Sequence, residues 1–343
     1  MGIAYADIDD AVLETQENFI KRGSFLDLQT DLTDHVATRE MWKGRKKVFN
    51  GGHPWRFDVQ MDHNHSARAV GLYETDGSSL TDTLQKGEVP VRHVNAHYIY
   101  DKREPDFQQG GHAIVNIVKS RYIGMMVSLY ELLEEFLWSK PTDSTDDKTP
   151  FGIAYWITKS ATEGFNGGNP SGFTSGKAGL SQSTYARWAN WAAQYTNITK
   201  ADLIRKMRTA HRKTQFRSPV SHANPDLGAM KNGIYTNSDV VGLMEEVLET
   251  QNMNLGNDLA SKDGRTMFKG TPITYAPYLD DDSSDPVYMI DWKWLAVGVM
   301  AGWENNLTNP YMVPGKHLVS RVDLDASLNM ICTNLRKQAV IYK

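Results

Sequence analysis

Histidine and carboxylate side chains with metal-binding chemistry gather in the first third of the sequence. Asp62, His63 and His65 lie close together, and His93 and His97 follow four positions apart. Imidazole and carboxylate suit zinc or another divalent metal, so a soluble metal-dependent enzyme using His63, His65 and His93 is one hypothesis. His93 and His97 could not share one ion on a single strand, because four strand residues span roughly 13 Å. Ordinary polar strand positions are the simpler interpretation.

Two further features could carry chemistry, and each has a simpler interpretation. The acidic run from Asp280 to Asp285 could ligate calcium, but it lacks the glycine and distal glutamate of a calcium-binding loop, so we expect a solvated loop. Cys332 is the single cysteine, which excludes an intrachain disulfide and fits a reducing compartment. We expect it to be a small buried apolar residue.

The remaining sequence favours a protein without catalysis or a cofactor. It contains no phosphate-binding loop, nucleophile elbow or HExxH motif, and the glycine-rich GFNGGNPSG lacks the residues that would close on phosphate. Charged residues make up 23% of the chain and the formal net charge is -4, which argues against a dedicated DNA-binding protein. No signal peptide and no apolar run of membrane-spanning length is present, so we expect no membrane association.

The histidines fall within residues 55–104, a stretch dense in strand-forming residues. Its strand-like runs are separated by the polar segment TDGSSLTDTLQKGE, which is too long for a tight hairpin turn. This pattern predicts an extended two-stranded flap with a polar tip. Such a flap is barely stable alone, so we expect contacts outside its own core to hold it.

A long amphipathic helix is predicted over residues 111–139. Glycines precede it and Pro141 follows it, and a proline disfavours helical geometry at the residue before it. At 1.5 Å per residue the helix would be roughly 40 Å long. Its apolar residues recur every three or four positions: Ile114, Val118, Tyr122, Met125, Leu129, Leu133 and Phe136.

A second predicted helix, starting after Thr199, is strongly basic. We expect its apolar residues Leu203, Ile204 and Met207 to be buried. Its cationic residues could be a solvated face, or could meet acidic groups of a neighbouring subunit or packaged nucleic acid. Arg205, Arg208 and Arg212 are the candidates for such a contact.

The later sequence predicts a compact mixed unit. GIYTNSDVVGLMEEV reads as a strand followed by a helix that is capped at Ser238 or Asp239. Strands follow at MFKGTPITYAPYLD and PVYMIDWKWLAVGVM, and the final segment from Lys316 onward is rich in strand formers. A strand pair at this end of the sequence is expected to return to an earlier sheet.

The order of these parts resembles the major capsid protein of tailed bacteriophages, which has the Hong Kong 97-like α+β fold. Local segments similar to this family are GGHAIVNIVKSRYIG, GLSQSTYARWANWAAQYT, GIYTNSDVVGLMEEV, FKGTPITYAPYLDDD and NMICTNLRKQAVIYK. The resemblance implies an N-terminal arm at residues 1–49, an extended β-hairpin loop at 50–105, a peripheral domain at 106–221 with 319–343, and an axial domain at 222–318.

The resemblance also implies a structural role rather than an enzymatic one. Copies would self-assemble into hexamers and pentamers of an icosahedral virion capsid around double-stranded DNA, in the cytoplasm of a bacterial host. The DNA contact would be weak and non-specific. Portal and decoration proteins are implied partners. The long helix starts too early to leave room for a cleaved scaffolding segment, so we expect a separate scaffolding protein.

Charged residues of the flap are the candidates for contact with an adjacent subunit: Glu74, Asp76, Asp82, Lys86 and Glu88. Some family members crosslink a lysine to an asparagine, but no motif here identifies a partner for Lys86, and we expect no crosslink. Two other hypotheses remain besides the metal-dependent enzyme. An encapsulin-like nanocompartment would share the fold and enclose enzymes, and a phage tail or decoration component would lack the long helix.

Overall fold

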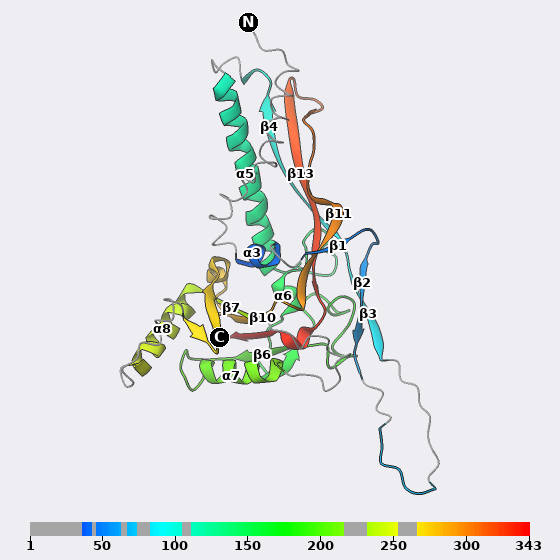
Figure 1. The fold of residues 1–343 in the computed structure, drawn as a ribbon, viewed down its shortest axis with the longest axis vertical. Coiled ribbons are helices and arrows are strands. Elements are labelled where there is room, and N and C mark those ends of the chain that lie inside the picture. Colours follow the sequence, from blue (N-terminus) through cyan, green and yellow to red (C-terminus); the bar gives the residue numbers. More distant parts are fainter. Residues whose placement is uncertain are drawn as a thin grey trace.

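A computed structural model of the chain describes residues 36–42, 46–62, 67–73, 83–104, 111–215, 232–252 and 266–343. The fold is mixed α+β. A five-stranded sheet lies beside the longest helix in the upper half, a seven-stranded sheet forms the lower half, and a two-stranded flap lies at the side (Figure 1).

The five-stranded sheet is centred on the longest strand, β13. It pairs antiparallel with β4 along one edge and with β11 along the other, and β1 extends the sheet as a parallel partner of β11. Helix α5 packs along β4, where the Arg121 guanidinium donates to the carbonyl of Ile99 at 3.1 Å. The strands are β1 (Lys46–Phe49), β4 (Arg92–Asp101), β11 (Leu295–Leu307), β12 (Tyr311–Met312) and β13 (Val319–Cys332).

Helix α5 (Gly111–Trp138) ends within one residue of the predicted position. Its inner face is apolar at three- and four-residue spacing, with Met126, Leu129 and Leu133 almost fully buried. The chain then returns over the helix end at Gly152, where a Cβ would lie 2.1 Å from the carbonyl oxygen of Ser139. Only glycine allows this close approach.

The seven-stranded sheet has a different helix on each face. Side chains alternate along a strand, so Ile234 and Met289 lie in the core under α7 while Tyr235 and Tyr288 lie on the opposite face. There Trp138, at the end of α5, packs 5.8 Å from the ring of Tyr235. Helix α7 (Leu203–Thr214) contacts β6 and β14, and α8 (Ser238–Asn252) contacts β9.

The order of strands in this sheet is not the order of the sequence. Successive neighbours are β5 (Gly164–Gly167), β6 (Asn190–Gln194), β14 (Ala339–Tyr342), β10 (Val287–Asp291), β7 (Asn232–Thr236), β9 (Thr271–Tyr275) and β8 (Met267–Phe268). Short helical turns α6 (Ile153–Trp156), η3 (Pro277–Asp281) and η4 (Leu335–Lys337) connect these elements.

Strand pairing joins segments from both sides of the expected domain boundaries. Residues 295–307 form β11 beside β13. Residues 339–342 pair with residues 190–194 and with residues 287–289 in the seven-stranded sheet. Residues 92–101 pair with β13 in the first sheet. The order of segments in the sequence does not specify these long-range pairings.

The flap consists of β2 (Trp55–Gln60) and β3 (Leu84–Val89), which pair antiparallel. Trp55 and Val89 are buried in the main core of the same chain. Phe57 lies opposite Gly87, and a Cβ on that glycine would lie 2.5 Å from the Phe57 ring. The base of the flap is therefore held by its own subunit, contrary to the expectation that outside contacts hold it.

A buried carboxylate attaches the first described helix to α5. Helix α3 (Val36–Trp42) begins beside Glu134, which accepts hydrogen bonds from the amides of Ala37 at 3.0 Å and Thr38 at 2.7 Å. The Thr38 hydroxyl and the indole N–H of Trp138 also donate to it, each at 2.7 Å. One carboxylate thus joins α3 to α5.

Candidate subunit interface

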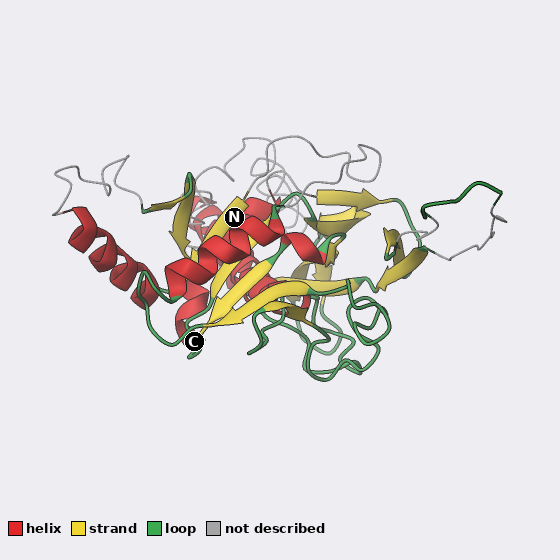
Figure 2. Ribbon diagram, turned by 90° about the horizontal axis from the view of Figure 1, so that it is seen from below, coloured by secondary structure: helices red, strands yellow, loops and turns green. Residues whose placement is uncertain are grey.

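Residues 67–73 form an exposed segment that projects beyond the flap strands. They lie far from the body, at the opposite end of the molecule from α8 (Figures 1 and 2). Leu72 is 94% exposed and Tyr73 is 103% exposed, and Val70 is exposed as well. Clustered exposed apolar side chains mark interaction surfaces in soluble proteins. The side chains of Val70, Leu72 and Tyr73 are therefore available for contact with another molecule.

The predicted flap candidates are only partly described. Glu74, Asp76 and Asp82 lie outside the described residues, and Lys86 and Glu88 are exposed on β3. Glu88 accepts a hydrogen bond from Arg56 at 2.7 Å, so it already has an ion pair within its own chain.

Helix α7 presents three arginines to solvent. Leu203 and Met207 are buried as predicted, whereas Ile204 is only half-buried. The predicted interface residues Arg205, Arg208 and Arg212 are all exposed along one side of the helix, at spacings of three and four positions. We call these three arginines the basic face. None of them has an ion pair within the described part of the chain.

A group of carboxylates lies near the lower end of α5. Glu131 and Glu135 are exposed one turn apart, and Asp281 is exposed on η3, which packs against α5. Burial, and then the negative charges of Glu135 and Asp281, raise the pKa of Tyr278 on η3. Glu131, Glu135 and Asp281, here called the acidic face, have no ion pair among the described residues. Sequence patterns missed this face because α5 and η3 are far apart in the chain.

The described histidines do not form a metal site. His63 and His65 lie outside the described residues, and His93 is exposed on β4 with its Nδ1 2.7 Å from the hydroxyl of Ser327. His97 is exposed four residues further along the same strand, opposite Asp323. Within the described ranges, no three histidine, cysteine or acidic residues come together to hold a metal ion.

The acidic run expected to be a solvated loop is largely structural. Asp280 accepts hydrogen bonds from the amide of Ser238 at 2.9 Å and the hydroxyl of Tyr275 at 2.5 Å. Asp282 pairs with Lys159 at 2.5 Å. Burial raises the pKa of Asp282, but the hydrogen bonds from Lys159 and Ser284 outweigh it and the pKa is lowered overall. These carboxylates join the loop to distant segments.

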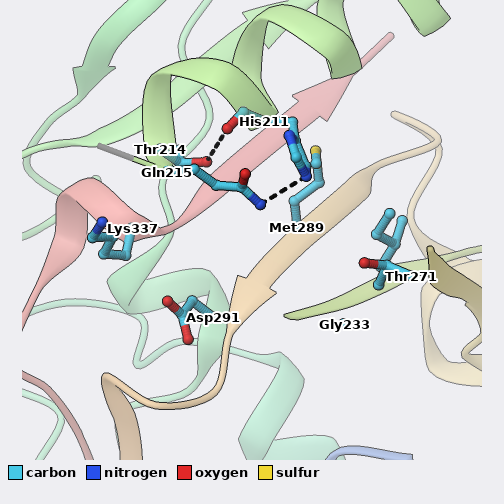
Figure 3. A pocket seen from close by; sticks show the side chains of 9 residues that line it. His211, Thr214, Gln215, Gly233, Thr271, Met289, Asp291 and Lys337 are labelled. Carbon is cyan, nitrogen blue, oxygen red and sulfur yellow. Dashed lines mark hydrogen bonds between the residues drawn. The ribbon is translucent and has the colours of Figure 1, made fainter. Parts of the chain in front are cut away.

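A small pocket lies between α7 and the seven-stranded sheet (Figure 3). At one side the ring Nε2 of His211 is 2.7 Å from the side-chain amide of Gln215, and buried Asp291 and Lys337 lie at the other side. Burial, and then the charge of Lys269, lower the pKa of His211. The lining residues come from α7, β7, β9, β10 and η4, so no local sequence pattern could have indicated this pocket.

Comparison with known proteins identifies the fold. The sequence matches no protein-family model and no curated protein. A chain of the cyanophage A-1(L) capsid asymmetric unit is 14% identical, with a TM-score of 0.58, and the match covers 87% of this chain and 90% of that chain. The capsid of a native GTA particle is 9% identical, with a TM-score of 0.51 and 90% of both chains covered.

A shell of another kind is also similar. The SrpI encapsulin of Synechococcus elongatus PCC 7942 is 10% identical, with a TM-score of 0.50, and the match covers 91% of this chain and 88% of that chain. The predicted capsid fold is therefore confirmed. Among the described helices, none is both long enough and apolar enough to cross a lipid bilayer.

Proposed function

We propose that this chain is the major capsid protein of a tailed bacteriophage. It would self-assemble into hexamers and pentamers of an icosahedral shell that encloses double-stranded DNA. The observation that carries the proposal is the similarity to capsid chains, which extends over most of both chains. The formal net charge of -4 fits a wall that encloses DNA without binding it tightly, since many phosphate contacts would make binding strong and salt-dependent.

The surface of the subunit supports assembly. The exposed apolar segment 67–73 projects beyond flap strands whose base is buried in the core of the same chain. Such a segment gains buried apolar area when it lies on a neighbouring copy. We propose that it does so, together with the charged flap residues Glu74, Asp76, Asp82 and Lys86. A separate scaffolding protein, a portal and decoration proteins are the proposed partners, and the host cytoplasm is the proposed place of assembly.

Negative-stain microscopy of the purified protein, alone and co-expressed with scaffolding protein, tests this function. Closed shells, or hexameric and pentameric rings, are the expected result. A uniform monomer or small dimer under both conditions would contradict it.

An encapsulin-like nanocompartment is the second candidate, because the SrpI shell chain is similar over a comparable share of its length. The contents of shells purified from a native source separate the two functions. Double-stranded DNA resistant to external nuclease supports the capsid. An enclosed protein cargo without nucleic acid supports the nanocompartment.

A further inference from the structure

The lower half of the subunit carries opposite charges on opposite sides. The basic face lies on α7, which covers one face of the seven-stranded sheet, and the acidic face lies near the end of α5, which packs on the other. The alternation of side chains along β7 separates them, because Ile234 points toward α7 and Tyr235 toward Trp138. In Figure 1 the end of α5 lies above this sheet and α7 lies below it.

Each charged face is unfavourable within an isolated subunit. Arg205, Arg208 and Arg212 are neighbours on the helix surface at three- and four-residue spacing, and like charges at these spacings repel. Glu131 and Glu135 form a like-charge pair four residues apart on α5. By contrast, Lys206 on the same basic helix has its own partner, Asp202, at 2.5 Å. Oppositely charged groups on another molecule would relieve both repulsions.

We propose that the basic face of one copy binds the acidic face of the next copy around a ring, so that α7 of each subunit lies against the end of α5 and η3 of its neighbour. This rests on the proposed function and specifies which surfaces form the contact. The contact joins two different surfaces, and such head-to-tail contacts close into rings when the rotation allows. A second copy supplies opposite charges to both faces at once, whereas nucleic acid would supply them only to the arginines.

Charge reversal tests the contact. The basic-reversed variant R205E/R208E/R212E and the acid-reversed variant E131K/E135K/D281K should each lose rings and shells under negative stain. A chain with all six changes should regain them, because every contact is again between opposite charges. K148E/K316E, which reverses two exposed lysines outside both faces, is the control and should assemble normally.

Mixing the two reversed variants gives a sharper result. Alternating copies place opposite charges at every contact, which is possible only in a ring with an even number of subunits. An equimolar mixture should therefore restore hexamers but not pentamers. Pentamers restored as efficiently as hexamers would overturn the head-to-tail pairing.

Neutral variants provide a second measurement if a reversed chain fails to fold, as judged by circular dichroism. R205Q/R208Q/R212Q and E131Q/E135Q/D281N should each weaken assembly, and combining them should add little further loss, since both remove the same contact. Fully additive losses would contradict the pairing.

The outcomes separate this contact from the proposed function. Wild-type protein that never forms rings or shells contradicts the function. Wild-type shells together with unaffected basic-reversed shells contradict only the contact. Basic-reversed shells that form normally but hold less DNA would assign the basic face to nucleic acid and overturn the contact between copies.

Discussion

Lys177 is a buried lysine whose hydrogen-bonding partners are neutral. Its ammonium group donates to the hydroxyl of Thr158 at 3.0 Å, the carbonyl of Gly167 at 2.9 Å and the side chain of Asn190 at 2.9 Å. It joins the glycine-rich loop to β6. Burial lowers the pKa of Lys177 to about 7, because the charged form loses its hydration.

Stability should therefore depend on pH through Lys177. Unfolded lysine titrates near 10.5, so between pH 7 and 10.5 the unfolded chain binds more protons than the folded chain, and the unfolding free energy rises with pH. Below pH 7 both states are protonated and the slope vanishes. In K177M this contribution, at most roughly 1.4 kcal/mol per pH unit, should be absent from denaturant unfolding curves. K148M, at an exposed position, is the matched control, and equal slopes for wild type and K177M would contradict the prediction.

Gly87 is a second residue whose identity the packing requires. In G87A the new methyl group would lie 2.5 Å from the Phe57 ring, which must move, so we expect a loss of about 1–3 kcal/mol in the free energy of unfolding. G124A, where nothing lies within 4 Å of the added methyl group, should be stabilising by about 0.5–1 kcal/mol. F57L should reduce the loss in G87A, and a G87A variant as stable as wild type would rule out this packing.

At the scale of elements, the attachment of α3 to α5 depends on one buried carboxylate. Removing the charge in E134Q weakens four hydrogen bonds and leaves an amide N–H facing other donors, so we expect α3 to detach at a loss of about 1–3 kcal/mol. Hydrogen exchange at the amides of Ala37 and Thr38 should accelerate. E131Q, on the same helix but exposed, should leave that exchange unchanged in the unassembled subunit. Unaltered protection in E134Q would exclude Glu134 as the anchor.

Elements with strong local signals were predictable from the sequence, and their pairing was not. The periodicity of α5 extends over many turns and ends near Pro141, so its bounds were predicted closely. The N-cap predicted for α8, Ser238 or Asp239, was wrong. The side-chain oxygen of Asn237, one residue earlier than Ser238, accepts a hydrogen bond from the amide of Val240 at 3.1 Å. Asparagine, serine and aspartate are nearly equal as caps, so sequence alone does not choose among them.

Of the two charged faces, the basic one could be predicted from the sequence and the acidic one could not. Helical periodicity correctly placed Arg205, Arg208 and Arg212 on an exposed face, because they alternate with buried Leu203 and Met207. The acidic face could not be predicted, since it combines side chains of α5 and η3 that only tertiary packing brings together.

At the scale of the whole molecule, the exposed segment 67–73 should affect assembly and not folding. In L72S/Y73N we expect no closed shells by electron microscopy but an unchanged free energy of unfolding of the free subunit, because both side chains are fully in solvent. Asparagine is chosen at residue 73 because the backbone there has a φ of 66°, which it tolerates well. Normal shells from this variant would remove the segment from the proposed interface.

The position of β14 also has a consequence for synthesis. Residues 339–342 lie between β6 and β10, so the seven-stranded sheet stays divided until they leave the ribosome. At ~5–20 residues per second, strand β6 waits on the order of 10 s for its partner after it is made. During that time α7 has β6 beneath it but lacks β14, the other strand of the sheet that it contacts. A copy truncated before residue 339 would lack the strand that joins β6 to β10, so it could not complete the seven-stranded sheet.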